Sequence, residues 1–338
     1  MVGVTPQLGP GALAETLAAL EVRVASAEVE LRAVPLADYP GGPRPSSVVR
    51  LSGKGCVGSG ENVAFYQQEH ERFRAYVAAW ARLHAGARLL HVGTALPAEG
   101  TPYERAALEA ALIDLALCQA RLSLSALTGV ETAKLRFVVS LATSAAPSAA
   151  VQHLRQQGFT GDLKIDVDPG WSPANLPAIA NDPSVAVFDF KSRGDAALAV
   201  ALSTSSAALL EDPPLSFDPP PHALARISRD SSVAEARSVA ALSLRGESVN
   251  LKAPRMGGPL EVLRGLEFAR STRRSEAAAQ PVAYLGGMFE VAVGRVQARM
   301  LAALYCPTGP NDLALNGAEP RANPPALIRL DLPGFGRA

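Results

Sequence analysis

The pattern of apolar and polar residues divides the chain into two parts. In the first part, residues 21–32 alternate apolar and polar side chains, which is typical of a half-buried strand. Two further strands are expected at 47–51 and 62–65, joined by a glycine-rich turn. Helices are expected at 67–84 and 102–128, where apolar residues recur at helical spacing. This order of elements predicts a small α+β unit.

From residue 134 onward, short apolar runs of strand type alternate with helical stretches. The expected strands lie at 135–141, 162–167, 185–190, 207–211, 225–228, 248–252 and 282–286. The expected helices lie at 148–157, 195–203, 232–242, 260–271 and 291–304. Alternation of strands and helices favours a parallel sheet. Seven such units favour a closed α/β barrel, and an open Rossmann-type sheet is the competing topology.

The composition limits the kinds of protein that this chain can be. Of its 338 residues 48% are apolar and 19% are charged, which is enough for a sizeable core and too few charges for disorder. The 32 basic and 32 acidic side chains balance, which argues against a nucleic-acid or anionic-membrane partner. No apolar run is long enough to span a membrane, and residues 1–10 lack the pattern of a signal peptide. With three scattered cysteines, we expect a cytoplasmic protein.

Charged residues stand at or just beyond the ends of five consecutive expected strands. They are Lys164 and Asp166, Asp189 and Lys191, Glu211, Asp230, and Lys252. Active sites of α/β barrels lie at the carboxyl ends of the strands, so these side chains should converge. Carboxylates on neighbouring strands suit a hard cation such as Mg²⁺, and a lysine beside it can transfer protons. One acidic residue at a strand end is more often a helix cap or a salt-bridge partner, but five positions in register favour a site.

A second motif points elsewhere. Gly53, Gly55 and Gly58 match G-x-G-x-x-G after a strand-like run, which is typical of dinucleotide-binding folds. That fingerprint requires a helix to begin within it, whereas the residues that follow favour another strand. We therefore interpret the glycines as a hairpin turn and expect no nucleotide cofactor, with a nicotinamide-dependent oxidoreductase as the rival.

Segments along nearly the whole chain resemble the enolase superfamily, in its muconate cycloisomerase and o-succinylbenzoate synthase branch. The most specific match is SVNLKAPRMGG (248–258), which resembles the N-x-K-x-x-x-x-G-G motif of strand six. The other matches are the hairpin VVRLSGKGCVGSGENV (48–63), the long helix from 103 to 129, the E-x-P motif ALLEDPP (208–214) and the closing LPGFG (332–336).

The resemblance implies a fold and a domain organisation. We expect an α+β capping domain over residues 1–130 and a modified TIM-type (β/α)7β barrel over 131–318. Residues 319–338 would form a C-terminal tail that packs back on the capping domain.

The resemblance also implies a chemistry. Mg²⁺ would be held by Asp189, Glu211 and Asp230. The family's common step is abstraction of a proton next to a substrate carboxylate, and the metal stabilises the enediolate that forms. Lys252 would donate or accept the proton, and Lys164 would lie near the carboxylate of a small substrate.

Two positions depart from the family's pattern. The family shows Lys-x-Lys on strand two, where this chain has Lys164 and Asp166, and Asp-x-Asn on strand three, where it has Asp189 and Lys191. Side chains two apart on a strand share a face, so Asp166 and Lys191 should form an ion pair at the barrel mouth. Lys191 would then be a relocated base. Alternatively, its ammonium group occupies the metal's place and the site is free of Mg²⁺.

Several functions are compatible with these residues. The leading hypothesis is a Mg²⁺-dependent lyase or isomerase similar to o-succinylbenzoate synthase, because such an elimination can use one lysine as both base and acid. Dipeptide epimerase and muconate cycloisomerase activities stay open, although epimerisation classically needs a base on each face of the substrate carbon. The alternative is an enolase-like fold with a degenerate site, either non-catalytic or of altered chemistry.

The remaining expectations concern support and assembly. Asn250 and Glu290 are expected to support the site. For Glu290 two interpretations stay open, a position at the rim of the site and a plain surface role. The partner would be a small carboxylate, with neither nucleic acid nor membrane. A homo-oligomer is compatible with the sequence.

Overall fold

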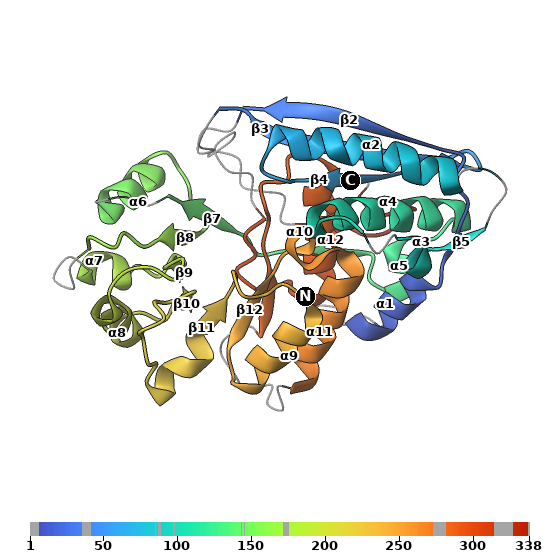
Figure 1. Ribbon diagram of the computed structural model, residues 1–338. Helices are drawn as coiled ribbons and strands as arrows, with labels where there is room; N and C mark the ends of the chain where they lie inside the picture. The colour runs from blue at the N-terminus through green and yellow to red at the C-terminus, as the bar shows by residue number, and fades with distance from the viewer. Residues whose placement is uncertain are drawn as a thin grey trace.

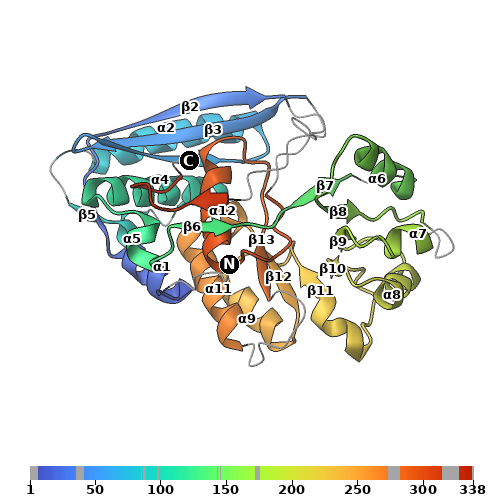
Figure 2. The same cartoon turned by 180° about the vertical axis from the view of Figure 1, so that it is seen from behind.

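The computed structural model describes residues 7–35, 42–84, 86, 89–96, 99–142, 144, 146–171, 176–272, 282–313 and 327–336. The described elements form two lobes, which Figures 1 and 2 show from opposite sides. The N-terminal lobe combines a small sheet with helices, and the other lobe is built around a parallel sheet.

An antiparallel sheet of three strands forms the outer layer of the N-terminal lobe. Its strands are β2 (Ser26–Val34), β3 (Arg44–Gly53) and β4 (Cys56–Asn62), paired in chain order. Helices α2 (Gln67–His84) and α4 (Pro102–Ala120) pack against this sheet (Figure 1). Since α4 lies between the sheet and the barrel, it is buried on almost every side.

The smaller elements of this lobe were only partly predicted. They are α1 (Pro10–Ala18), β1 (Glu21–Val22), β5 (Leu90–His91), α3 (Val92–Ala95) and α5 (Leu124–Thr128). β1 pairs with β5, whereas β2 pairs with β3. The single strand expected at 21–32 is therefore divided in two. The cause is Gln119, which binds the backbone N–H and carbonyl of Arg23 at 3.0 and 2.8 Å and takes the place of a neighbouring strand.

Two other boundaries were wrong. The strand expected at 62–65 ends at its first residue, because the Asn62 side chain accepts a hydrogen bond from the Ala64 N–H at 3.0 Å and turns the chain. The helix expected at 102–128 is two helices. Arg121 has a left-handed backbone with φ of 56°, which ends α4.

The glycine motif lies in a hairpin, as predicted. β3 pairs with β4 up to Gly53 and Cys56, and the turn between them contains Gly55 with φ of 74°. No helix begins in this described segment, so the dinucleotide fingerprint is absent there. Gly58 has a different role, because a Cβ atom on it would lie 2.2 Å from the Leu115 backbone nitrogen on α4. Glycine at this position allows the strand to approach the helix closely.

The second lobe contains a parallel sheet of seven strands. They are β7 (Val138–Leu141), β8 (Asp162–Asp166), β9 (Val185–Asp189), β10 (Leu209–Glu211), β11 (Ile227–Arg229), β12 (Ser248–Leu251) and β13 (Ala283–Leu285), in this order across the sheet. Residue Asn311 bridges to Phe137 before β7, and Asp312 bridges to Gly286 after β13. These bridges join the two edges of the sheet. The predicted TIM-type barrel is confirmed, and the open Rossmann-type sheet is wrong.

Helices follow the barrel strands on the outside (Figures 1 and 2). They are α6 (Pro147–Gln156), α7 (Pro177–Ala180), α8 (Ala196–Ser205), the 3-10 helix η2 (Pro221–Arg226), α9 (Ala236–Leu244), α10 (Ala253–Met256), α11 (Pro259–Thr272) and α12 (Val293–Tyr305). Apolar residues of α9, α11, α12, α4 and the N-terminal lobe belong to one continuous core cluster. The two lobes therefore share a core.

The end of the chain contacts both lobes. β14 (Leu327–Arg329) pairs with β6 (Thr132–Lys134). The Phe335 N–H donates to Asp114 of α4 at 2.7 Å, and its carbonyl accepts from Gln297 of α12 at 2.9 Å. Residues 319–326 of the expected tail lie outside the described residues, and the expected domain limits stay predictions.

None of the described helices has the length and apolar character needed to cross a membrane.

Glu109 joins the lobes and should make stability depend on pH. It lies on α4 with 6% exposure and accepts a hydrogen bond at 2.8 Å from the Leu260 N–H at the start of α11. Burial raises the pKa of Glu109 from 4.5 to about 7. The folded state therefore binds a proton that the unfolded chain has released, so stability present below pH 4.5 is lost as the pH rises through 7.

We expect Glu109→Gln, which keeps the acceptor but does not titrate, to remove this loss. Relative to the wild type, the variant should gain about 3 kcal/mol of unfolding free energy between pH 4.5 and 7. Urea unfolding across this range measures the gain. Glu71→Gln, at an exposed position on α2, is the control. Equal pH slopes for Glu109→Gln and the wild type would contradict the prediction.

Candidate active site

Three carboxylates stand side by side at the carboxyl ends of neighbouring strands. The sheet register pairs Asp166 with Asp189, and Asp189 with Glu211. Paired residues of parallel strands lie next to each other, so like charges would repel unless cations separate them. This arrangement explains why lysines occur at the same level of the barrel.

Lys164 lies between the carboxylates. Its Nζ is 3.0 Å from Asp189 Oδ2, hydrogen-bonds Glu211 Oε1, and is 3.5 Å from Asp312 Oδ2. The side chain is 3% exposed, so it is not a solvated charge at the end of the strand. Burial by itself would lower the pKa of Lys164, but Glu211, Asp189 and Asp312 raise it well above its ordinary value. Lys164 is therefore a buried ammonium group.

Lys191 forms the ion pair predicted with Asp166. Its Nζ lies 2.9 Å from Asp166 Oδ1 and 2.9 Å from Asp189 Oδ2. However, the hypothesis that Lys191 occupies the position between the expected metal ligands is wrong, because Lys164 is there. Lys191 follows the end of β9 in a left-handed conformation with φ of 52°, so it reaches the carboxylates from the rim and its side chain stays 48% exposed.

Glu211 is fully buried and both of its oxygens have partners. Oε2 accepts a hydrogen bond from the Tyr284 hydroxyl and one from Asn250 Nδ2 at 3.2 Å. The Tyr284 hydroxyl also lies 2.8 Å from Ser228 Oγ. Asn250 thus contacts an expected metal ligand, and its supporting role stays a prediction, whereas Tyr284 and Ser228 were missed. The signal for Tyr284 was a polar group on an otherwise apolar, buried strand. Ser228 lies on a strand that also carries Arg229, so no such signal marked it.

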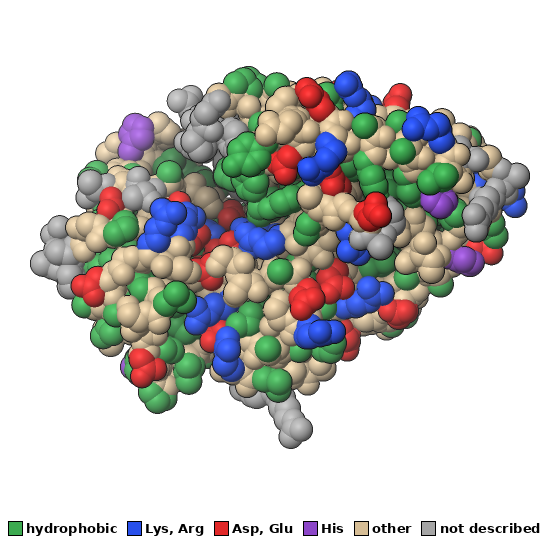
Figure 3. Space-filling model, viewed as in Figure 1, with side chains coloured by type: hydrophobic (Ala, Val, Ile, Leu, Met, Phe, Trp, Pro, Cys, Tyr) green, Lys and Arg blue, Asp and Glu red, His purple; other side chains and the backbone are tan. Residues whose placement is uncertain are grey.

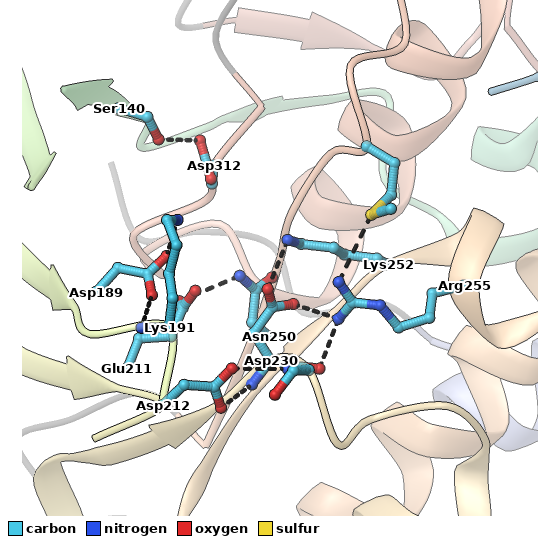
Figure 4. A network of polar contacts seen from close by, with 12 residues as sticks. Ser140, Asp189, Lys191, Glu211, Asp212, Asp230, Asn250, Lys252, Arg255 and Asp312 are labelled. Atoms are coloured by element: carbon cyan, nitrogen blue, oxygen red, sulfur yellow. Dashed lines mark hydrogen bonds and ion pairs between the residues drawn. The ribbon is translucent and has the colours of Figure 1, made fainter. Parts of the chain in front are cut away.

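A second group of ion pairs lies beside the first. Lys252 Nζ lies 2.8 Å from Asp230 Oδ2, and Arg255 Nη1 lies 2.6 Å from Asp230 Oδ1 (Figure 4). Burial alone would raise the pKa of Asp230, but Lys252, Lys164 and Arg255 hold it at about 2. Arg255 was missed, although it lies three residues after Lys252 in the most specific sequence motif.

Two further acidic residues complete the surroundings. Asp312, on the segment that closes the barrel, accepts a hydrogen bond from Ser140 Oγ at 2.8 Å (Figure 4). Glu290 does not fit either of its expected roles. It is 2% exposed, its carboxylate accepts from the Met288 N–H at 2.9 Å, and it lies 3.8 Å from Arg295. Glu290 therefore stabilises the loop after β13 from within, because the loop folds over its side chain.

The expected metal ligands do not form a metal-binding group in this arrangement. Among the residues that the structure describes, no three His, Cys, Asp or Glu side chains are placed to hold an ion. Mg²⁺ needs several oxygens at about 2.1 Å around one point. Lys164 separates Asp189 from Glu211, and Asp230 faces Lys252 and Arg255 instead. The residues as placed do not fit Mg²⁺, which stays a prediction from the sequence.

These side chains surround a pocket of about 190 Å³. It is lined by Ser140, Ala142, Lys164, Asp166, Asp189, Lys191, Asp230, Lys252, Gly287, Phe289, Arg295 and Asp312. Figure 3 shows acidic and basic side chains beside a hollow near the middle of this face. The chain has only five lysines, and three of them line the pocket. Since arginine does not release its proton in proteins, the lysines are the basic groups here that can transfer one.

Comparison with protein families assigns the chain. Residues 131–318, more than half of the chain, match the C-terminal domain model described as a domain of unknown function (DUF8230), and residues 15–127 match its N-terminal domain model. This chain belongs to the DUF8230 family. No match is found among curated proteins.

Solved structures confirm that the DUF8230 chain has the enolase-superfamily fold. A member of that superfamily from Listeria innocua matches with a TM-score of 0.71 and 19% identity, over 93% of this chain and 94% of the other. A dipeptide epimerase from Enterococcus faecalis matches with a TM-score of 0.69 and 19% identity, over 93% of this chain and 99% of the other. Muconate lactonizing enzyme from Pseudomonas putida matches with a TM-score of 0.62 and 16% identity, over 86% of this chain and 88% of the other. At these identities the likeness establishes the fold alone.

The buried hydroxyl of Tyr284 gives a test of the DUF8230 site. In Tyr284→Phe, Glu211 Oε2 and Ser228 Oγ lose a buried hydrogen-bond partner, which should cost about 1–3 kcal/mol of unfolding free energy. Urea unfolding measures the loss. Tyr66→Phe, at an exposed position, is the matched control and should be neutral. Equal stability of Tyr284→Phe and the wild type would show that the hydroxyl does not support Glu211.

Proposed function

We propose that this chain is an enzyme, a lyase or isomerase that moves a proton next to the carboxylate of a small substrate. The fold that it shares with a muconate lactonizing enzyme and a dipeptide epimerase supports this class of reaction. The observation that carries the proposal is the meeting of Lys191 and Lys252 in one pocket, from strands on different sides of the barrel.

Lys252 is the group that we propose to transfer the proton. It follows β12 directly, and its Nζ points into the pocket while Asp230 holds it at 2.8 Å. Arg255 fixes the other oxygen of Asp230, so the position of the lysine is determined by two ion pairs. A proton carrier must be held within hydrogen-bond reach of its target, and this arrangement supplies that.

Lys191 is proposed to bind the substrate carboxylate. Burial alone would lower the pKa of Lys191, but Asp189 and Asp166 raise it, so the group stays charged at neutral pH. A permanently charged, half-exposed ammonium group is better suited to attract an anion than to act as a base. This replaces the role of relocated base expected from the sequence.

With one lysine for proton transfer, the finer proposal is an elimination of the o-succinylbenzoate synthase type. As the neutral amine, Lys252 would remove the proton, and as the resulting ammonium group it would give that proton to the leaving group. Epimerisation is less well supported, because it classically needs a second base on the opposite face. A non-catalytic binding protein is the second candidate. The observation in its favour is that the expected metal ligands already face ammonium or guanidinium groups.

Proton exchange tests the proposal. Carboxylates that include hydroxy acids, dipeptides and lactones with a free carboxylate group are incubated with the protein in D₂O, and loss of the α-proton signal is followed by NMR. We expect the wild type to exchange at least one of them. Lys252→Met should slow this exchange by about 100-fold or more, because it removes the proton carrier.

Lys134→Met, at an exposed position on β6, is the matched control and should exchange at the wild-type rate. Equal exchange by Lys252→Met and the wild type would remove Lys252 from the reaction. If the wild type exchanges none of the compounds, with or without Mg²⁺, the binding protein becomes the better explanation.

A further inference from the structure

We propose that the ammonium group of Lys164 is the resident cation of this site and stands in place of a divalent metal. The inference goes beyond the proposed reaction and does not depend on it. It concerns how the buried carboxylates are neutralised, and it predicts that the folded protein does not take up Mg²⁺ there.

The first argument is the position of Lys164. Its Nζ contacts Asp189, Glu211 and Asp312, three carboxylates from three different segments of the barrel. An ammonium group has three N–H donors, so it can face several carboxylates at once. A metal ion shared by Asp189 and Glu211 would have to displace this nitrogen from a place where it is almost fully buried.

The second argument is that the other oxygens of these ligands are already used. Glu211 Oε2 accepts from Tyr284 and Asn250. Asp189 Oδ1 accepts from the backbone N–H of Lys191 at 3.0 Å. A carboxylate oxygen that already accepts a fixed donor cannot turn toward an ion without disturbing a buried hydrogen bond.

The third argument is the place of Asp230, the remaining expected ligand. Lys252 and Arg255 each bind one of its oxygens. Its backbone is held as well, because Asp212 accepts hydrogen bonds from the Asp230 N–H at 3.0 Å and the Ser231 N–H at 2.9 Å (Figure 4). Asp230 therefore belongs to a separate ion-pair group and is not free to complete an octahedral metal site.

The fourth argument is the balance of charge. The carboxylates that take part in these contacts are Asp166, Asp189, Glu211, Asp230 and Asp312, and the cations are Lys164, Lys191, Lys252 and Arg255. The carboxylates exceed the cations by one charge. A bound dication would therefore reverse the sign of the site and leave an excess of positive charge among buried groups, unless an ammonium group left.

The test is direct binding of Mg²⁺ to the folded full-length protein. After treatment with a chelator, the wild type is titrated with millimolar Mg²⁺ by calorimetry, and its Tm is measured with Mg²⁺ and with chelator. We expect no saturable heat and the same Tm in both conditions. Saturable binding by the wild type that is lost in Glu211→Gln would overturn the inference.

Lys164→Met tests the same inference from the other side. Without the ammonium group, Asp189 and Glu211 are left as buried, uncompensated carboxylates, so the Tm should fall by about 10 °C. Mg²⁺ should then bind saturably and recover part of the lost Tm. Lys164→Met combined with Glu211→Gln should lose that response, and Lys134→Met should behave as the wild type. A folded Lys164→Met that ignores Mg²⁺ would contradict the proposed exchange of cations.

Lys164→Arg covers the case in which the methionine variant does not fold. It keeps the positive charge, so it should not acquire Mg²⁺ binding, and saturable binding by this variant would count against the inference. None of these measurements uses turnover. Failure of proton exchange and uptake of Mg²⁺ are therefore separate results, and either can occur without the other.

Discussion

The contact of Lys164 with Asp189 and Glu211 is the constraint on which the site depends. The register of β8, β9 and β10 places acidic residues next to each other at the carboxyl end of the barrel, where Asp189 and Glu211 are buried from water. Removing carboxylates from water costs several kcal/mol each unless cations and hydrogen bonds compensate. Lys164 supplies the cation, and Tyr284 and Asn250 supply the remaining donors to Glu211. The rest of the pocket is arranged around this buried ion-pair centre.

The N-terminal lobe determines the shape of the pocket through the loop after β13. Glu61 accepts hydrogen bonds from the N–H groups of Val291, Ala292 and Gly294, at distances of 2.8, 3.0 and 3.0 Å, at the start of α12. Arg44, which is fully buried, donates to the Met288 carbonyl at 3.3 Å. The loop held in this way carries Gly287 and Phe289, which line the pocket. The two lobes thus act together, because one supplies the strand ends and the other holds the loop that faces them.

The exchange of charge between β8 and β9 separates this chain from the enolase pattern that it resembles. Asp166 stands where the second strand-two lysine is expected, and Lys191 stands where the strand-three asparagine is expected. The lysine is thus moved to the rim, and the four positions together carry one positive charge fewer than the expected pattern. Lys164 is left as the cation closest to the expected metal ligands. A shared fold can therefore present a different arrangement of acids and bases, which is why the function has to be argued from the site.

The sequence by itself determined the kind of fold and the residues that meet. Strand–helix alternation predicted the barrel, and the charged residues at strand ends predicted which side chains converge, because both depend on local periodicity and on the common edge of parallel strands. The pair of Asp166 and Lys191 followed from the same geometry. Tertiary structure alone decided that Lys164, and not Lys191, lies between the carboxylates. This depends on the depth of Lys164 in the barrel and on the left-handed turn after β9, which keeps Lys191 at the rim. It also decided the contacts of Tyr284 and Arg255. Tyr284 binds Glu211, which is far away along the chain, and Arg255 reaches Asp230 from the turn after β12, so no local sequence pattern indicates either contact.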